Sequence, residues 1–324
     1  MKRCAILQSC NLVIHSSHPK GNYIMERTQL VLLVILCLCF VVDLSYPQSE
    51  KQRDTTSITV MLRFDDIGMC HGLNSAIGEV ASTGMPISVS VMFACPWYQE
   101  AVPILKQFPN VSVGVHLVLN SEWKNYRWGP VTGAGSVPSL VDSDGYFFPS
   151  RAALFAHSPR VEEVEKELRA QIDRAVRSGL RIDYLDYHMG AAVQTPELRA
   201  VVEKLAKEYH VGISRYFGER GADGVYNAPI EGKTDTLMHI ANSLTPGVRW
   251  LFVFHIGLET PEMDALVDMN SFGLPNVSKH RNAERKAFLS ERFQNALRSR
   301  KIQLRSYYDV IRESGLESMR RPEQ

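Results

Sequence analysis

Polar side chains that suit metal binding and proton transfer follow four apolar runs of the sequence. Adjacent carboxylates repel one another and are costly to desolvate, so Asp65 and Asp66 need a cation nearby if they lie where water is scarce. One aspartate with two histidines can hold a metal ion and leave coordination positions open for water and substrate. The residues concerned are Asp65 and Asp66 after VMLRF, His116 in VGVHLVLN, Asp186 and His188 in YLDYHMG, and His255 in FVFHIG.

Each of these residues also has a purely structural explanation. A histidine in an apolar strand is commonly a hydrogen-bonded core residue, and two aspartates after a strand commonly cap a helix. The ligand types are scattered, and no compact metal motif such as HExxH occurs in the chain. The metal hypothesis depends on a coincidence, because three apolar runs each carry a histidine near the carboxyl end and a fourth ends in two carboxylates.

The elements that must position these residues show in the pattern from Ser57 onward. Short apolar runs alternate there with segments of helical period, which is typical of βα units and a parallel sheet. The pattern predicts helices over 71–84 and 160–178, with Gly84 and Gly179 at their carboxyl-terminal caps. The predicted strands are SITVMLRF, ISVSVMF, VSVGVHLVL, IDYLDY, VGIS, VRWLFVFHI and IQLRS.

About seven βα units in roughly 265 residues predict an α/β fold with a single domain over residues 51–324, a complete or distorted (β/α) barrel of about seven parallel strands. Sites of such folds lie at the carboxyl ends of the strands, where the polar residues collect. Two long segments without a clear period, 120–151 and 259–279, are expected to be functional loops.

The first 50 residues form a leader that differs from the rest of the chain. The apolar run LVLLVILCLCFVV over residues 30–42 is shorter than the about 20 residues of a membrane span and has the length of a signal-peptide core. We therefore expect an exported protein, periplasmic or secreted. The alternative is an uncleaved amino-terminal anchor, and the long lead-in suggests that translation starts at Met25.

The charge balance gives no reason to expect a nucleic-acid partner. The chain has 36 basic and 35 acidic side chains and is 45% hydrophobic, as in soluble globular proteins. A homo-oligomer is compatible with this composition. Cys70 and Cys95 are the cysteines outside the leader, and they either pair in an oxidising compartment or remain two buried thiols.

The segments DDIG, VGVHLVLN, DYHMG and HIG, in this order, resemble the YdjC-like carbohydrate deacetylases, the family that includes chito-oligosaccharide deacetylase. The resemblance covers the chain from about residue 57 to 311. It implies a distorted α/β barrel that holds one divalent metal ion, Mg²⁺ or Zn²⁺, and hydrolyses the N-acetyl group of a carbohydrate.

The resemblance also implies a role for each strand-end residue. Asp66 resembles the metal-binding aspartate, and His116 and His188 resemble the two histidine ligands. Asp65 then resembles the catalytic base, and His255, when protonated, the acid that assists the departing amine. General acid–base help of this kind typically contributes about 10²- to 10⁴-fold.

Two departures from the family pattern leave the substrate open. Ile67 stands where the family commonly has Phe, and Tyr184 and Gly190 stand where its HxDxHxH motif has histidines. Chito-oligosaccharide is therefore the leading candidate substrate. The candidate substrate-binding residues, with surface or packing roles as the alternatives, are Arg215, Trp123, Trp128 and Asp186.

Two other functions compete with deacetylation. The same residues could hydrolyse an ester or phosphate bond with a metal-activated water. A secreted sugar-binding protein without turnover is the alternative outside enzymes, but a pure binder has no need for Asp65 beside a metal ligand.

Overall fold

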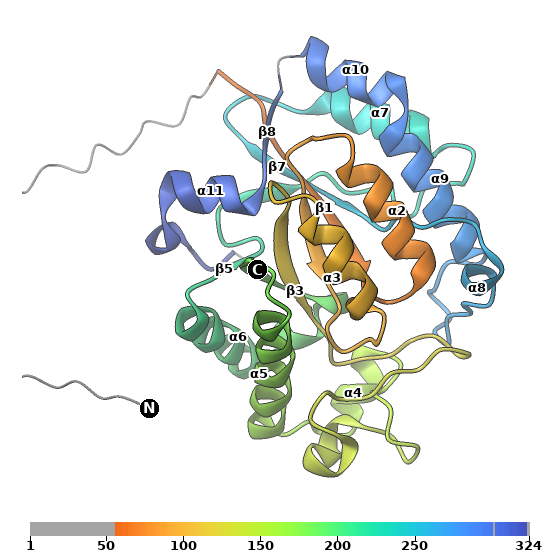
Figure 1. The fold of residues 1–324 in the computed structure, drawn as a ribbon, viewed down its shortest axis with the longest axis vertical. Helices are drawn as coiled ribbons and strands as arrows, with labels where there is room; N and C mark the ends of the chain where they lie inside the picture. The colour runs from red at the N-terminus through yellow and green to blue at the C-terminus, as the bar shows by residue number, and fades with distance from the viewer. Residues whose placement is uncertain (1–55, 301, 323–324) are drawn as a thin grey trace, which may run out of the picture. The chain divides into compact units, whose positions relative to one another are not determined.

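The computed structural model describes residues 56–300 and 302–322, and these residues are built around a parallel sheet (Figure 1). The strand order is β5-β4-β3-β2-β1-β7-β6, with β8 paired to the first half of β1. The strands are β1 (Thr59–Ile67), β2 (Ser88–Val91), β3 (Ser112–Leu117), β4 (Ile182–Tyr187), β5 (Gly212–Ile213), β6 (Glu219–Gly221), β7 (Arg249–Phe254) and β8 (Gln303–Arg305).

The predicted fold class is confirmed as a curled, incomplete barrel. All seven predicted strands are present, and β6 is an additional strand of three residues, Glu-Arg-Gly, which lacks the apolar pattern that predicts a strand. Within the described residues, the end strands β5 and β6 do not pair with each other, so the sheet stays open.

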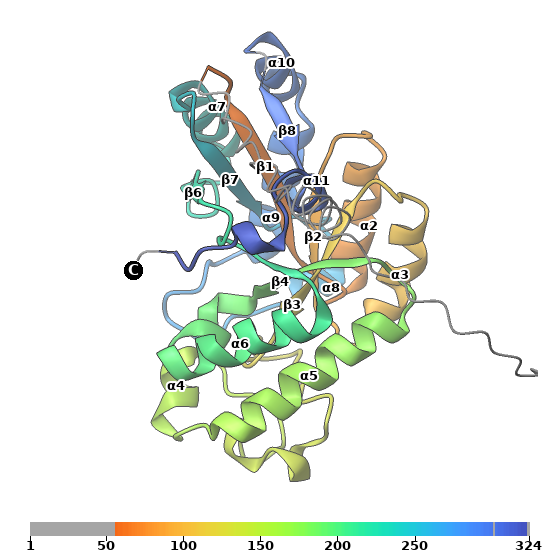
Figure 2. The ribbon, with the colours of Figure 1, turned by 90° about the vertical axis from the view of Figure 1, so that its left-hand side faces the viewer.

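Helices cover the sheet, and the two predicted helices are confirmed within a few residues of their ends. In Figures 1 and 2, α2 lies beside α3, and α5 lies beside α6. Gly84 and Gly179 have positive φ beyond the ends of α2 and α5, as expected for caps. The helices are α2 (His71–Ala81), α3 (Tyr98–Lys106), α4 (Arg151–Ala156), α5 (Val161–Arg177), α6 (Pro196–Tyr209), α7 (Lys233–Ser243), α8 (Pro261–Asp264), α9 (Val277–Leu289), α10 (Glu291–Ser299) and α11 (Tyr307–Ser314), with short 3₁₀ turns η1 (Ala134–Ser136), η2 (Pro138–Leu140), η3 (His188–Val193) and η4 (Leu316–Ser318).

An aromatic cluster fixes the carboxyl ends of β1 and β7. Phe64 stacks on Phe254 with ring centroids 5.2 Å apart, and Phe288 of α9 meets both rings edge-on. Such pairs stabilise a core beyond the burial of their area. Since Phe64 and Phe254 are also register partners in the sheet, the residues that follow them, Asp65 within β1 and His255 just after β7, lie at the same level of the sheet.

A β-bulge explains how two adjacent aspartates reach the same cavity. Phe64 pairs with Val89 and Ile67 with Val91, so β1 contains one more residue than β2 over this stretch. The sequence-based placement of Asp65 and Asp66 after the strand is therefore wrong, because β1 continues to Ile67. Asp66 has φ 65°, which breaks the normal alternation of side chains.

The two long loops predicted by the sequence lie against each other. Trp123 and Asp268 form an isolated antiparallel bridge. The Lys124 amide donates to the Val267 carbonyl at 2.8 Å, and the Met269 amide donates to the carbonyl of Glu122 at 2.9 Å. These bonds make segments 120–151 and 259–279 a paired structure at one side of the site.

The leader lies outside the described residues, so the boundary at residue 51, the signal peptide and the start at Met25 stay predictions. No helix in 56–300 or 302–322 is long and apolar enough to span a membrane.

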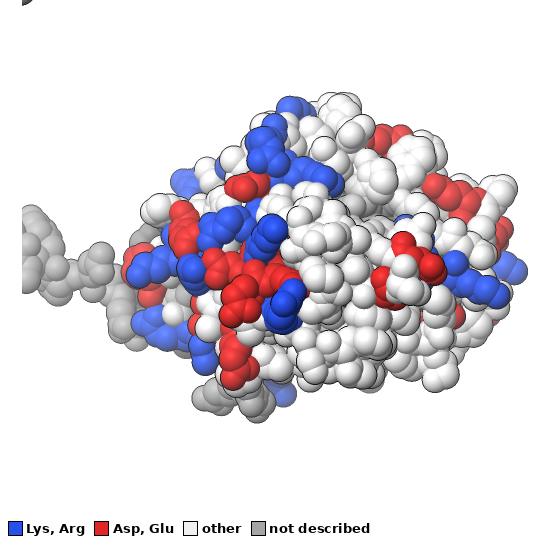
Figure 3. All heavy atoms as spheres, turned by 90° about the horizontal axis from the view of Figure 1, so that it is seen from below, with Lys and Arg blue, Asp and Glu red and all other residues white. Residues whose placement is uncertain are grey.

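On the face shown in Figure 3, acidic and basic side chains are interspersed beside a broad uncharged area. Cys70 and Cys95 are both free and buried, so the alternative of two buried thiols is the one observed.

Candidate metal centre and active site

A cavity of about 460 Å³ lies at the carboxyl ends of the central strands. This size is within the range of about 300 to 1,000 Å³ found for small-molecule sites. The structure brings all five strand-end residues predicted for ligation and proton transfer into its lining. They are Asp65, Asp66, His116, His188 and His255, and their individual roles stay predictions.

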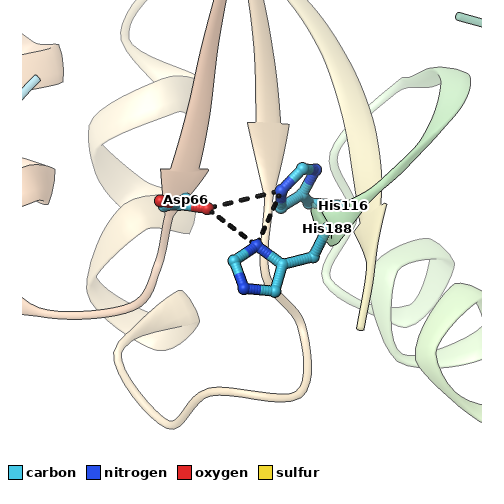
Figure 4. Close-up of side chains that lie close together, drawn as sticks. All are labelled: Asp66, His116 and His188. Atoms are coloured by element: carbon cyan, nitrogen blue, oxygen red, sulfur yellow. Dashed lines mark hydrogen bonds and ion pairs between the residues drawn. The ribbon is translucent and has the colours of Figure 1, made fainter. Parts of the chain in front are cut away.

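Asp66, His116 and His188 converge with three potential ligand atoms (Figure 4). Asp66 Oδ1 lies 3.3 Å from His116 Nε2 and 3.2 Å from His188 Nδ1, and the two nitrogens lie 3.3 Å apart. A tetrahedral ion with bonds of about 2.0–2.1 Å separates its ligand atoms by about 3.3 Å. Asp66 Oδ1 is buried and accepts no hydrogen bond, so the three residues fit a metal ion.

A second carboxylate orients each histidine of this triangle. His116 Nδ1 donates to Asp186 Oδ2 at 2.9 Å, which leaves Nε2 free toward Asp66. His188 Nε2 donates to Glu122 Oε2 at 3.0 Å, which leaves Nδ1 free in the same way. Carboxylate–histidine pairs of this kind fix the ring and its tautomer at metal sites.

The buried carboxylates also set the charge preferences of the two rings. Burial disfavours the charged form of His116, but its hydrogen bond to Asp186 and the nearby Asp65 and Asp66 raise its pKa to about 9. Burial acts likewise on His188, and the charges of Glu122 and Asp66 raise its pKa to about 10. Both imidazoles thus lie in a strongly negative environment.

Arg63 binds the carboxylates that are not part of the triangle. Its Nε and Nη2 donate to the two oxygens of Asp65, each at 2.7 Å, and its Nη1 lies 2.9 Å from Asp186 Oδ1. Asp65, His116 and Asp186 also offer three close ligand atoms, but the guanidinium already binds both of those carboxylates. The triangle around Asp66 is therefore the better metal site.

Arg281 of α9 completes the surroundings of Asp66. Its Nη2 donates to Asp66 Oδ2 at 2.7 Å, and its guanidinium lies 5.8 Å from the centre of the Trp123 ring. Burial would raise the pKa of Asp66, but Arg281 and the two histidines hold it well below the usual range. Asp66 is thus held as a carboxylate.

The buried formal charges around the triangle leave room for a divalent cation. Four buried carboxylates, of Asp65, Asp66, Glu122 and Asp186, lie in and around the triangle, and the two guanidinium groups of Arg63 and Arg281 bind the three aspartates among them. With both rings neutral, as ligation requires, two negative charges remain, and a bound divalent ion would compensate them. Without an ion, the raised pKa values of His116 and His188 favour a proton on each ring, which compensates the same charges.

His255 lies on the cavity wall with Tyr226, and their rings are 4.8 Å apart. Its backbone amide donates to Glu284 Oε1 at 2.7 Å, while Lys233 donates to the carbonyls of Val225 and Tyr226. Burial lowers the pKa of His255 to about 4, so the expectation of a protonated ring needs correction: the imidazole is neutral in the free chain.

The four candidate substrate-binding residues have different outcomes. Arg215 and Trp123 line the cavity, and the Trp123 indole N–H has no hydrogen-bond partner. Trp128 is buried, donates to the Asn120 carbonyl and packs on His188, so it is a packing residue. Asp186 lines the cavity, but Arg63, His116 and Ser90 bind its oxygens. Its role is therefore to orient site residues and not to bind substrate.

Sequence reasoning missed Glu122, Arg63, Arg281 and Glu284. Arg63 had a signal, because a residue two positions before Asp65 lies on the same face of the strand and a buried strand rarely contains an unpaired arginine. The other three gave no signal. Glu122 lies in a loop, and Arg281 and Glu284 lie on α9, where the apolar period that predicts a helix does not mark a polar residue as part of a site.

Comparisons with known proteins agree with this architecture. The family model described as YdjC-like protein matches residues 59–299. A protein of Brevibacillus brevis named carbohydrate deacetylase is 34% identical over 154 residues, which are 48% of this chain and 58% of that protein. A Thermus thermophilus protein of the same name is 33% identical over 233 residues, 64% of this chain and 81% of that protein. The chain thus spans less than two thirds of the first relative's length.

A solved structure shares the fold. The crystal structure of an Enterococcus faecalis V583 protein, described as a candidate cellobiose-phosphate cleavage protein, superposes with a TM-score of 0.61 at 22% identity. The superposition covers 78% of this chain and 99% of that one.

Replacing Asp186 by Asn, or Glu122 by Gln, should weaken metal binding while the chain stays folded. Each change removes the carboxylate that orients one histidine, and loss of such partners typically lowers metal affinity about 10- to 100-fold. Competition with a chromophoric Zn²⁺ chelator measures the affinity. Asp183→Asn is the matched control, because Asp183 is buried on the same strand but binds Ser112 and Arg181 outside the cavity. Equal losses in Asp183→Asn and Asp186→Asn would contradict the assignment.

Proposed function

The chain belongs to the YdjC-like protein family, and on that premise we propose that it is a metal-dependent hydrolase that removes N-acetyl groups from an amino sugar or a chito-oligosaccharide-like carbohydrate. The relatives named carbohydrate deacetylase support the amide bond and the sugar. The observation that carries metal dependence is the triangle of Asp66, His116 and His188, whose ligand atoms are spaced as around one ion.

The donor set indicates which divalent ion fits. Two imidazole nitrogens and one carboxylate suit zinc and similar transition metals, whereas magnesium prefers oxygen ligands and water. We therefore expect Zn²⁺ to bind more tightly than Mg²⁺. When bound, such an ion polarises the amide carbonyl and lowers the pKa of a coordinated water.

Asp65 is the proposed base. A carboxylate offers about four acceptor positions, and Arg63 uses two of them, one on each oxygen. The remaining positions can accept the proton of the attacking water. Arg63 also offsets the repulsion between Asp65 and Asp66.

His255 is the proposed proton donor to the departing amine. Because the ring is neutral in the free chain, it must first accept a proton. The attacking water releases one proton and the amine requires one, so a relay from Asp65 to His255 balances the reaction. The hydrogen bond from the His255 amide to Glu284, and the one from Lys233 to the Tyr226 carbonyl, hold these two residues in place for this transfer.

We further propose that the protein is exported, because residues 30–42 have the length and apolarity of a signal core. Amino-terminal sequencing of protein recovered outside the cytoplasm should place cleavage between about residues 42 and 52. Replacing Met25 by Ala tests the start site, since loss of the product would assign translation to Met25. Recovery in the cytosol alone, with the leader intact, would refute export.

The proposed reaction predicts release of acetate from acetylated amino sugars. Enzyme stripped with a chelator should lose activity, and added Zn²⁺ should restore it, because the triangle needs an ion to act. Acetate and the new amine are measured together. Release of phosphate, or of an alcohol from an ester but no amine, would indicate the competing hydrolases; sugar binding without any product would indicate a binding protein.

Replacing a metal ligand and replacing a proton-transfer residue should have different effects on metal occupancy and turnover. His188→Ala deletes a metal bond and should lower both occupancy and turnover. His255→Ala and Asp65→Asn should keep the ion, because neither residue belongs to the triangle, yet slow hydrolysis by about 10²-fold or more.

The control for these variants is His239→Ala, which removes an exposed histidine on α7. Metal content by elemental analysis and turnover are measured side by side, with folding checked by circular dichroism. If His255→Ala loses metal as thoroughly as His188→Ala, or if Asp65→Asn keeps normal turnover, the division of roles is wrong.

A further inference from the structure

Phe272 is the most exposed of the large apolar side chains in the described part of the chain, at 68%. It lies on the loop between α8 and α9, and it also lines the cavity of the metal triangle. A side chain that meets both the cavity and solvent lies where the cavity opens. An aromatic ring that lines the opening of a cavity is available to contact a ligand there.

The loop that carries Phe272 is held in a defined position. The Met269 amide donates to the Glu122 carbonyl, and Asn270 Nδ2 donates to the Pro149 carbonyl, each at 2.9 Å. Asp268 folds over Gly273, where a Cβ would lie 2.4 Å from the Asp268 side chain. The turn that carries Phe272 is therefore tight and is held by hydrogen bonds to neighbouring loops.

The cavity opening combines this ring with polar groups. Asp223 and Asn227 are exposed and belong to the same cavity lining. A pyranose ring has an apolar face of C–H groups and an edge of hydroxyl groups. An aromatic ring together with carboxylate and amide side chains matches that combination.

We propose that Phe272 is a platform for a sugar unit next to the one that carries the acetamide, and that it sets the preference for an oligosaccharide over a monosaccharide. The proposal rests on the proposed deacetylase function. The amide must reach Asp65 and Asp66, which are buried at the strand ends, whereas Phe272 lies at the opening. A single sugar unit engaged at Asp65 leaves the ring uncovered, and a linked second unit covers it.

The test compares Phe272→Ala with Phe272→Trp on N-acetylglucosamine and on its β-1,4-linked dimer and trimer. Loss of the platform should lower kcat/KM for dimer and trimer by roughly 10-fold, mainly through KM, because the contact is made equally in ground and transition states. The monomer should change less than about twofold, since it does not reach the ring. Phe272→Trp should retain the preference. Val267→Ala is the control, because Val267 is exposed on the same loop but does not line the cavity.

Calorimetric binding of the trimer to wild type and Phe272→Ala separates the platform from the chemistry. Weaker trimer binding by Phe272→Ala supports the platform even if the wild type releases no acetate. The absence of acetate release would contradict the proposed function but not the platform. Equal losses for monomer and trimer, or no loss for either, would overturn the platform. A shift in sedimentation of Phe272→Ala with unchanged kcat/KM would also overturn it and assign Phe272 to a contact between subunits.

Discussion

The site depends on two adjacent carboxylates that the chain buries side by side. Asp65 and Asp66 lie at the end of β1 with almost no exposure, and a pair of buried like charges is unfavourable unless each has its own cation. The structure separates the two: Arg63 binds Asp65, while Arg281 binds one oxygen of Asp66. The other oxygen of Asp66 faces His116 and His188 without a donor, and this imbalance is what makes the triangle suited to an ion.

Preorganisation comes from layers behind the residues that touch the cavity. Asp186 and Glu122 orient the two histidines, and Glu122 is itself tied through its carbonyl to the loop of Met269. Glu284 and Lys233 hold the wall formed by His255 and Tyr226. Sites built on strands and braced in this way keep their geometry without rearrangement when substrate arrives.

The sequence was sufficient to predict the fold class and the five strand-end residues for one physical reason. Apolar runs mark buried strands, and a parallel sheet brings their carboxyl ends together, so Asp66, His116 and His188 had to be neighbours. The bulge in β1 was not predictable, since one extra residue leaves the apolar pattern unchanged. Glu122 and Arg281 were missed because their contacts join a loop and a helix to positions far away in the chain. For Trp128 the packing alternative is the one observed, and the sequence left it open because composition cannot separate a buried aromatic residue from an exposed one.

The left-handed conformation of Asp66 restricts how this site can evolve. That region of backbone space accepts glycine, asparagine and aspartate far more readily than bulky or β-branched residues. Of these three, aspartate alone provides a carboxylate. Substitutions at position 66 are therefore restricted by the backbone conformation before they are selected for chemistry, and Asn and Gly are the replacements that fit it. Either replacement would remove the carboxylate that Arg281 binds, so a lineage that lost this ligand would keep the backbone conformation but leave a buried guanidinium without its counter-ion.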